Sequence, residues 1–520
     1  MQREGADITA EDMVGPLTEP SNIQQYFSSS TIFVTGATGF LGRLLVEKLL
    51  RTCFDLSKMY ILVRPKGNKS VEQRLQEYFD DALYERLKRE KSEAMAKLFV
   101  IEGDCYLPDL GLNEQDKQLI ISEVNYIFHA AATLRFNEKL RVAAYTNARG
   151  TRDILKLAKK ITNLRSFVYV STAYSFCPRK IIDEEFYEPH ITGDKLLTLV
   201  ETLNDDVLEK IAPILIDEWP NTYTFTKSVA EDIIRKESNG LPIAVVRPSI
   251  VVVTSKEPVS GWINNSYGAT GIFVNIGMGV VRTLYCDATY VSDLVPADYA
   301  INTMIAAAWN IAKTRGSNLN SEMPKQETDC NNIPVYNYVS STQNPITWRE
   351  CISKGNQHLS KAPSVLQIWH SVFKTTSSTY GYLFLHYTLH LLPAYIVDFL
   401  AFCIGKRPQM VKMYGKIEKL LDVLGYFMRR EWVFRNNNTQ ELWKMLNDED
   451  KKLFEFDMSL LDWDMFFYTY VRGVRVYLVK DPLNTIAEAR AKRFKLMIAH
   501  YALVTIFMSI FVMFVWHVML

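Results

Sequence analysis

A chain of 520 residues is too long for one ordinary domain and predicts two or three folded units. Hydrophobic residues make up 48% and charged residues 22% of the chain, a composition that excludes an intrinsically disordered protein. The 59 Lys and Arg residues balance 58 Asp and Glu residues, so the net charge gives no reason to expect nucleic acid as a partner.

The N-terminal residues 1–28 are predicted to be a flexible leader. They carry several acidic side chains and no early apolar run, which argues against a secretory signal peptide. The seven cysteines stand singly, without a CxxC pair. We therefore expect reduced and mostly buried thiols in a protein that faces the cytosol.

Between residue 29 and about residue 345, short apolar runs alternate with helical stretches. Strands are predicted at residues 31–35, 59–63, 98–101, 124–129, 166–170 and 243–247. Helical stretches at 71–97, 138–160 and 223–238 separate most of these strands. Such alternation predicts an α/β fold of Rossmann type, in which a doubly wound parallel sheet is covered on both faces.

A mainly helical domain is predicted at residues 346–480, after a helix at 298–313, a polar loop at 316–333 and a strand at 335–339. The stretch 380–404 is ambiguous, because it is apolar but is interrupted by Pro393 and Asp398. It is typical of a buried or interfacial helix pair, and a second membrane contact stays open as the alternative.

The C-terminal residues 496–520 contain no Asp, Glu, Lys or Arg. At about 1.5 Å per residue, a helix of this length crosses a hydrocarbon core of about 30 Å. Four basic residues lie just before it, and positive charge beside a span tends to stay in the cytosol. We predict a single transmembrane anchor with the remainder of the chain in the cytosol; a buried C-terminal hairpin is the alternative.

Three glycines follow the first strand directly, and Gly36, Gly39 and Gly42 have the spacing GxxGxxG. The first allows a tight turn, the second lets the backbone approach a pyrophosphate, and the third permits close helix–strand contact. Because this turn opens a helix, phosphates would meet free N–H groups and the positive end of the helix dipole. The order strand, glycine turn, helix therefore predicts a dinucleotide site.

The residues after the next strands predict which dinucleotide is bound. Arg64 follows the second strand, where an acidic residue would bind the ribose of NAD, and its guanidinium can pair with a 2′-phosphate. We therefore expect NADPH. Asp104, after the third strand, could accept a bond from the adenine, and Ala131, after the fourth, is small enough to lie against the cofactor.

A candidate catalytic group combines a helix with a strand end. Tyr223 and Lys227 are four residues apart and share one helical face, where the cation would lower the pKa of the phenol and hold the nicotinamide ribose. At the end of the fifth strand, Thr172 is expected to be the second donor to a substrate carbonyl, with Ser171 as the neighbouring candidate. His129 is expected to pack or hydrogen-bond, and no clustered set of metal ligands is visible.

Together these motifs resemble a known superfamily. TGATGFLG, the Gly-Asp pair, FHAAAT, NARGT, YVSTAY and YTFTK follow one another as in the extended short-chain dehydrogenase/reductases. This resemblance implies that Thr38, Phe40, Leu41 and Asn147 also belong to the cofactor site. EWPNT before YTFTK, together with GWINN and GKRP, resembles the fatty acyl-CoA reductases over nearly the whole chain before the anchor.

The resemblance to fatty acyl-CoA reductases implies a substrate and a place of action. NADPH would reduce a long-chain or very-long-chain acyl-CoA, through a bound aldehyde, to a primary fatty alcohol with release of CoA. The lipid bilayer is the expected partner because long acyl chains partition into it, and a homo-oligomer stays open. We expect the endoplasmic reticulum, with the peroxisome and the lipid droplet as alternatives.

Two other interpretations stay open. A membrane-bound sterol or sugar-nucleotide dehydrogenase of the same superfamily would share the cofactor site and act on another substrate. A catalytically inactive membrane scaffold is the non-enzymatic alternative, and the intact Tyr223, Lys227 and glycine set argues against it.

Overall fold

The structure is a computed structural model that describes residues 20–64, 71–319 and 333–520. Its contacts divide the chain into two compact units, each discontinuous in sequence. The sheet unit comprises Met1–Ser260, Asp293–Pro345 and Trp432–Leu461, and the helical unit comprises Gly261–Ser292, Ile346–Glu431 and Asp462–Leu520. These units differ from the contiguous ranges 29–345 and 346–480 that the sequence predicts, because each unit recruits segments from both ranges.

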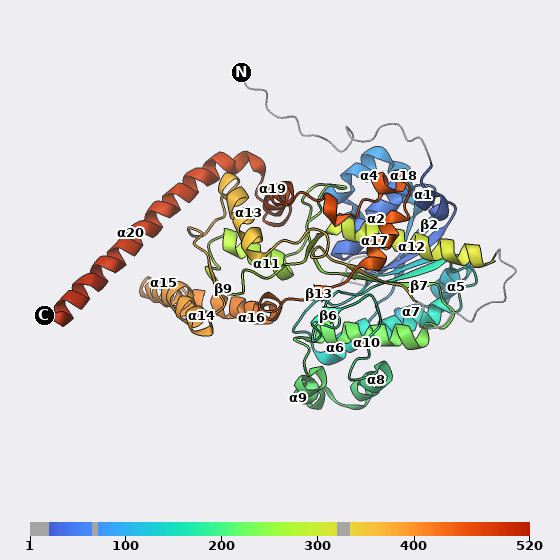
Figure 1. Cartoon of the computed structure of the whole chain (residues 1–520), viewed down its shortest axis with the longest axis horizontal. Coiled ribbons are helices and arrows are strands. Elements are labelled where there is room, and N and C mark those ends of the chain that lie inside the picture. The colour runs from blue at the N-terminus through green and yellow to red at the C-terminus, as the bar shows by residue number, and fades with distance from the viewer. Residues whose placement is uncertain (1–19, 65–70, 320–332) are drawn as a thin grey trace, which may run out of the picture. The chain divides into compact units, whose positions relative to one another are not determined.

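Within the described residues, one parallel sheet of seven strands lies at the centre of the sheet unit (Figure 1). Its strand order is β11-β7-β5-β4-β1-β2-β3. The order reverses between β1 and β4, and ligands of open α/β sheets bind beyond the carboxyl ends of the strands at such a point. The predicted doubly wound α/β fold is confirmed. The strands are β1 (Thr31–Thr35), β2 (Lys58–Val63), β3 (Leu98–Glu102), β4 (Tyr126–His129), β5 (Ser166–Val170), β7 (Ile243–Pro248) and β11 (Val335–Tyr338).

The central strand β1 is buried along its whole length. Phe33 stands opposite Tyr60 of β2 on one side and Ile127 of β4 on the other. A strand covered on both faces needs no alternation of polar and apolar residues, which explains its β-branched and aromatic composition. This rigid strand fixes the position of the glycine turn that follows it.

Helices cover both faces of the sheet. On one face, α2 (Phe40–Thr52) packs against α12 (Ala297–Leu319), and on the other α7 (Gly150–Ala158) packs against α10 (Thr222–Glu237) (Figure 1). The core beneath α7 and α10 includes Phe33, Ile154 and Phe225.

Three sequence predictions need correction. The end of the expected leader is folded, because residues 22–27 form α1 (Asn22–Phe27) with Ile23 and Phe27 buried; residues 1–19 lie outside the described residues. The expected helix at 71–97 is interrupted between α3 (Val71–Phe79) and α4 (Glu85–Glu90), where the Asp81 side chain caps a short turn. The expected loop at 316–333 begins later, because α12 continues to Leu319, and residues 320–332 lie outside the described residues.

The helical unit is built from helices and one short strand pair, β9 (Thr283–Tyr285) with β12 (Lys374–Thr376). Two helical stretches are long and apolar enough to cross a membrane, Thr379–Cys403 and Leu483–Met519, and they indicate membrane association. The helices are α11 (Gly268–Gly277), α13 (Trp348–Lys361), α14 (Thr379–His386), α15 (Leu392–Cys403), α16 (Met410–Met428), α19 (Trp463–Gly473) and α20 (Ile486–Met519).

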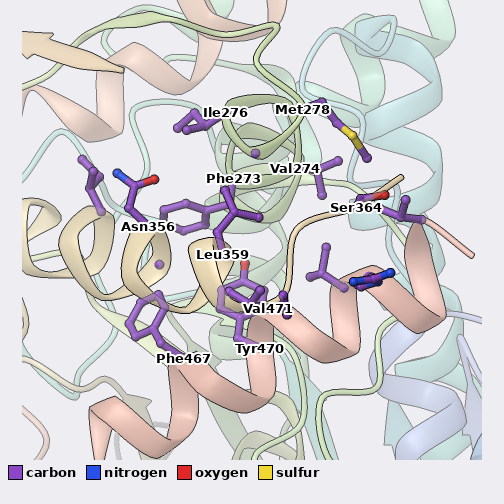
Figure 2. A pocket seen from close by; sticks show the side chains of 17 residues that line it. Phe273, Val274, Ile276, Met278, Asn356, Leu359, Ser364, Phe467, Tyr470 and Val471 are labelled. Carbon is purple, nitrogen blue, oxygen red and sulfur yellow. The ribbon is translucent and has the colours of Figure 1, made fainter. Parts of the chain in front are cut away.

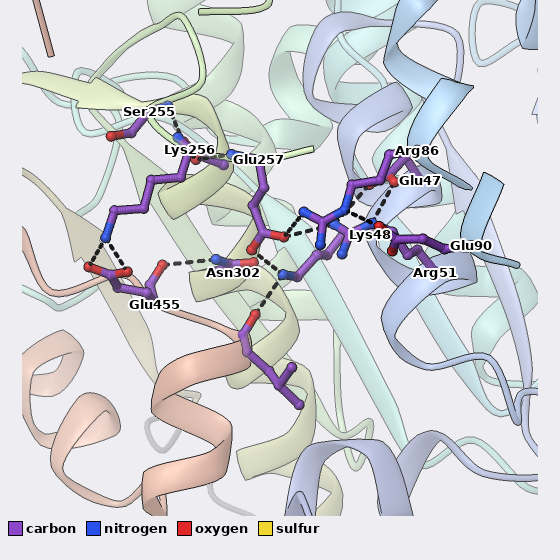
Figure 3. Close-up of polar contacts among 12 residues, drawn as sticks. Glu47, Lys48, Arg51, Arg86, Glu90, Ser255, Lys256, Glu257, Asn302 and Glu455 are labelled. Atoms are coloured by element: carbon purple, nitrogen blue, oxygen red, sulfur yellow. Dashed lines mark hydrogen bonds and ion pairs between the residues drawn. The ribbon is translucent and has the colours of Figure 1, made fainter. Parts of the chain in front are cut away.

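A network of ion pairs and hydrogen bonds connects segments of the sheet unit that are far apart in the sequence (Figure 3). Lys48 and Arg51 of α2 both pair with Glu257, and the Lys48 ammonium also donates to the carbonyl of Leu453 at 2.6 Å. The Asp298 carboxylate accepts backbone N–H groups of residues 255–257 at 2.8–3.1 Å. Because these charges are paired, their burial is tolerated, and the network holds α2 against segments that follow it by some 200 and 400 positions.

Candidate active site

The glycine turn between β1 and α2 leaves no room for side chains. Gly36 has a φ of +73°, and a Cβ there would lie 2.6 Å from the backbone of Ala130 and Ala131. A Cβ on Gly42 would lie 2.1 Å from the Gly36 carbonyl oxygen. Gly39 is the N-cap of α2 and offers no side-chain cap, so the positive end of the helix dipole faces the glycine turn, as in sites that bind an anion. Thr38 is exposed beside Gly39, and Phe40 and Leu41 are half-buried at the start of α2.

Two neighbouring arginines lie in the segment that follows β2. Arg64 is exposed directly after β2, as expected. Arg74 of α3 was missed by the sequence analysis; burial and the neighbouring Arg64 charge lower its pKa. Its Nη1 atom is buried without a hydrogen-bond partner among the described residues. A pair of like charges with an unused donor fits an additional phosphate group.

The other residues expected around the cofactor have defined partners. Asp104 accepts the N–H of Tyr106 at 2.9 Å, and Ala131 donates its N–H to the Thr35 hydroxyl at 3.4 Å. The buried Asn147 accepts the N–H of Thr133 at 2.9 Å and donates to the Thr226 hydroxyl at 2.9 Å. Asn147 therefore ties the segment after β4 to α10.

Tyr223 and Thr172 meet at the carboxyl end of β5. Asn221 caps α10 by accepting the N–H of Thr224 at 2.9 Å, which places Tyr223 in the first turn of the helix. The phenol of Tyr223 lies close enough to the Thr172 hydroxyl for that hydroxyl to affect its pKa, and its ring packs against Phe136 at 5.9 Å. Burial raises the pKa of Tyr223, and the Thr172 contact lowers it by less. The expected lowering by Lys227 is corrected here, because burial dominates.

Lys227 is buried one turn further along α10. Its ammonium donates to the Tyr169 hydroxyl at 2.9 Å and to the Val170 carbonyl at 2.6 Å, and it lies 4.3 Å from the centre of the Tyr169 ring. Burial lowers the pKa of Lys227 to about 7, although the Glu231 carboxylate opposes this shift. The partner of the ammonium is therefore Tyr169, which the sequence analysis did not single out.

Ser171 faces a different group from Thr172. Its hydroxyl donates to Glu231, whose carboxylate pairs with Arg247 at 2.6 Å, and both charged side chains are fully buried. Ser171 thus belongs to a structural ion pair, whereas Thr172 faces the phenol. The signal for this pair was present in the sequence, since Glu231 follows Lys227 by four residues and Arg247 is a charge within an apolar strand.

His129 is buried at the end of β4. Its Nδ1 lies 2.6 Å from the Thr35 hydroxyl and its Nε2 lies 3.1 Å from the Thr151 hydroxyl, and the ring stacks on Tyr169 at 5.7 Å. Burial and the Lys227 charge lower its pKa to about 3, so the imidazole is neutral near pH 7. These contacts are those of a residue that packs and hydrogen-bonds.

The helical unit encloses an apolar cavity of about 730 Å³, including its open mouth (Figure 2). Its lining includes Phe273 of α11, Leu359 of α13 and Val471 of α19, which are labelled in Figure 2. Most of its wall is hydrophobic, and Asn356, Ser364 and Arg475 are its polar members. Small-molecule sites have this composition.

A glycine cradle for a pyrophosphate beside a Tyr-Lys helix defines a nicotinamide-dependent reductase of the short-chain dehydrogenase/reductase class. Family models described as "Male sterility protein" match residues 34–304, the NAD-binding part, and 389–481. Fatty acyl-CoA reductase wat of Drosophila melanogaster is 37% identical over 96% of this chain and 93% of its own length. Fatty acyl-CoA reductase 1 of Rattus norvegicus is 36% identical over the same shares. The chain belongs to the fatty acyl-CoA reductase family, which confirms the resemblance of its motifs.

Solved structures share the fold at low sequence identity. The reductase domain of a nonribosomal peptide synthetase from Mycobacterium tuberculosis matches with a TM-score of 0.56 and 18% identity, over 90% of this chain and 97% of that one. The terminal R domain of the myxalamid pathway matches with a TM-score of 0.55 and 20% identity, over 92% and 97%.

Proposed function

We propose that this protein reduces long-chain or very-long-chain acyl-CoA to a primary fatty alcohol, with NADPH as the cofactor and free CoA as the second product. The observation that carries the proposal is the proximity of the Tyr223 phenol to the Thr172 hydroxyl just after the carboxyl end of β5, in the same sheet unit as the glycine turn. When bound, the cofactor supplies hydride, and the conversion of a thioester to an alcohol takes two.

The residues of the chain supply hydrogen bonds and protons. Tyr223 and Thr172 donate hydrogen bonds to the substrate oxygen, which gains negative charge as the carbonyl carbon is reduced. Tyr223 then gives its proton to the alkoxide that becomes the alcohol. Lys227, which Tyr169 and the Val170 carbonyl hold in place, lies one helical turn from the phenol and supports the negative charge left on it.

Arg64 and Arg74 favour NADPH over NADH. The two cations are neighbours in the segment after β2, and the buried Nη1 of Arg74 has an unused donor among the described residues, which supports a site for a 2′-phosphate. A guanidinium matches phosphate oxygens in charge and geometry.

The apolar cavity of the helical unit is suited to an alkyl chain. Phe273, Leu359 and Val471 present hydrophobic surface to it, and an alkyl chain needs no polar partner in its wall. We assign the cavity to the tail of the substrate, and α20 to an anchor in the endoplasmic reticulum membrane with the sheet unit in the cytosol. The peroxisome and the lipid droplet are the alternatives that localisation of the tagged full chain would decide between.

The experiment is an assay of the purified full chain in lipid vesicles with NADPH and palmitoyl-CoA or longer acyl-CoA. We expect free thiol and fatty alcohol to appear in equal amounts, with two NADPH consumed per alcohol. Turnover of only 3-hydroxysteroids or nucleotide sugars would overturn the substrate assignment, and an absence of all turnover with bound NADPH would favour a scaffold.

A further inference from the structure

The helical unit carries an apolar arm, which we define as α14, the π-helical turn Tyr387–Leu391, α15 and Ile404. Its outer face exposes large hydrophobic side chains, with Phe384 67%, Phe402 71% and Ile404 69% exposed. Soluble proteins rarely leave a contiguous apolar surface of this kind uncovered. We propose that the apolar arm lies in the headgroup–acyl boundary of one bilayer leaflet, as a membrane contact separate from α20.

The chain segments on both sides of the arm bind the two residues that directly follow β9. Before the arm, the carbonyl of Thr376 accepts the N–H of Cys286 at 3.1 Å. After it, α16 leads back to Met428, whose carbonyl accepts the N–H of Asp287 at 3.2 Å. Because two adjacent residues, Cys286 and Asp287, bind the segments that enter and leave the arm, the chain goes out and comes back on one side of the membrane.

The middle of the arm is bound to polar groups of the helical unit. His390 accepts the N–H of Arg282 at 2.8 Å, and the Arg282 guanidinium donates to the Leu389 carbonyl at 3.0 Å. His386 lies 3.5 Å from the Glu418 carboxylate. A membrane-spanning helix would place these groups at the bilayer centre, where charged and polar contacts are most costly. The part of the arm beyond these contacts, α15, has 12 residues and is about 18 Å long, too short for a hydrocarbon core of about 30 Å.

Asp398, the one acidic residue of the arm, is turned away from its apolar face. Its carboxylate accepts the N–H groups of Gln409, Met410 and Val411 at 2.8, 2.8 and 2.9 Å, at the start of α16. There the carboxylate accepts hydrogen bonds from backbone N–H groups that have no partner within the helix, and its negative charge interacts favourably with the positive end of the helix dipole. The buried Ala394 shares this inner face with Asp398, so the outer face keeps an unbroken hydrophobic surface formed by Tyr395, Phe399, Leu400 and Phe402.

Two features identify a lipid surface as what covers this face. Lys406 and Arg407 are exposed in the turn after the arm, where their charges can reach lipid phosphates while the apolar face is immersed. In addition, the arm and the C-terminal end of α20 project to the same side of the helical unit (Figure 1). Beyond Tyr501 almost every side chain of α20 is exposed, as expected of a helix that enters a bilayer there.

Cys403 offers a native labelling position, because it is exposed on α15 while the other cysteines of the described residues are buried. The test uses the full chain with Cys330→Ser, reconstituted in phosphatidylcholine and phosphatidylserine vesicles, with an environment-sensitive fluorophore on Cys403. We expect quenching by shallow nitroxide lipids to exceed quenching by deep ones, at a depth of about 5–10 Å. Phe399→Asp with Phe402→Asp should return the probe to water while α20 keeps the chain in the vesicles.

The matched control carries Cys403→Ser and Gln357→Cys, with the probe on an exposed position of α13 that should stay in water. A Cys403 probe as water-exposed as this control would overturn the proposal. So would quenching that is strongest at the bilayer centre, which is the result for a span. Dipolar broadening between nitroxides on Cys403 of different copies would assign the face to a second copy of the chain, and would also overturn it. None of these outcomes depends on catalytic activity.

Discussion

The phenol of Tyr223 lies beside the Thr172 hydroxyl, and the proposed reaction gives Tyr223 two tasks, a hydrogen bond to the substrate oxygen and the transfer of a proton to it. We expect Tyr223→Phe to lower kcat about 10²–10³-fold, since one donor and the proton source are lost. NADPH should still bind, because the glycine turn is unchanged. Alcohol formation by mass spectrometry and NADPH fluorescence titration measure the two effects. Tyr267→Phe, at an exposed position, is the control and should leave both unchanged.

The buried Lys227 makes stability depend on pH. Its pKa is about 7 in the folded protein and about 10.5 when exposed, so between these values only the unfolded chain holds the proton. Wild-type stability should therefore rise with pH relative to Lys227→Met, by at most about 1.4 kcal/mol per pH unit between pH 7 and 10.

Melting temperatures of both proteins at pH 7 and 9 test this. The advantage of Lys227→Met over the wild type should shrink as the pH rises. Lys256→Met, at a largely exposed position, should show no such trend. A constant difference across the range would mean that Lys227 stays charged in the folded protein.

Arg64 and Arg74 should set the preference for the phosphorylated cofactor. Loss of one charge-assisted bond to phosphate costs about 1.5–3 kcal/mol, so Arg64→Ala and Arg74→Ala should each raise the KM for NADPH about 10–100-fold. The KM for NADH should stay the same. Arg89→Ala is the control, because the Arg89 side chain is 66% exposed, and it should change the KM for neither cofactor. Equal changes for both cofactors would contradict a role at the 2′-phosphate.

The residues that the sequence revealed are those whose role depends on neighbours along the chain. Gly36 and Gly42 follow a strand, and Tyr223 and Lys227 share a helical turn, so local spacing was sufficient. Tyr169, Arg74 and the Glu231–Arg247 pair act through tertiary contacts. The raised pKa of Tyr223 was also hidden, because burial is a property of the fold and not of the motif.

At the scale of elements, the cavity between α11, α13 and α19 should limit the length of the substrate tail. Val471→Trp fills the cavity, and we expect kcat/KM for very-long-chain acyl-CoA to fall at least about tenfold relative to a medium-chain substrate. Met465→Trp, on an exposed position of α19, is the control and should not change the ratio. A uniform loss with all chain lengths would indicate a structural defect.

The strands were predictable because β1, β2 and β5 are short apolar runs that need no partner to be recognised. The region 71–97 was not, because its helical periodicity continues through Asp81, whose side chain caps a new turn instead of extending the helix. For residues 380–404 the sequence left a buried or interfacial helix pair and a second membrane contact open, because it does not show that Asp398 binds the start of α16.

For the whole molecule, α20 should be the element that makes membrane attachment irreversible. Phe507→Asp with Phe511→Asp places two charges in the exposed apolar part of α20. Inserting each charge near the bilayer centre costs about 2.5–3.5 kcal/mol of insertion free energy. We expect the variant to be released by alkaline carbonate, whereas the wild-type chain stays in the pellet. The paired variant Phe507→Leu with Phe511→Leu controls for the loss of aromatic rings. Retention of the charged variant would assign the anchor to another segment.

The division into two interleaved units could not be predicted from composition. The segment Trp432–Leu461 belongs to the sheet unit, where the half-buried Glu184 carboxylate accepts the N–H groups of Asn337 and Thr439 at 2.9 and 3.2 Å. Burial raises the pKa of Glu184 to about 7. Pairings over such sequence distances leave no periodic signal, so a contiguous boundary near 345 was the natural reading.

The bond from Lys48 to the Leu453 carbonyl has a consequence for how the protein is made. During translation Lys48 is synthesised early, whereas its acceptor, the Leu453 carbonyl, is synthesised only after most of the chain. The sheet unit therefore stays incomplete until residue 461 has emerged, by which time the segment Ile346–Glu431 of the helical unit has also been synthesised. A gene fragment that ends at codon 345 would encode a sheet unit without the segment Trp432–Leu461. That unit would lack the Leu453 carbonyl that binds Lys48.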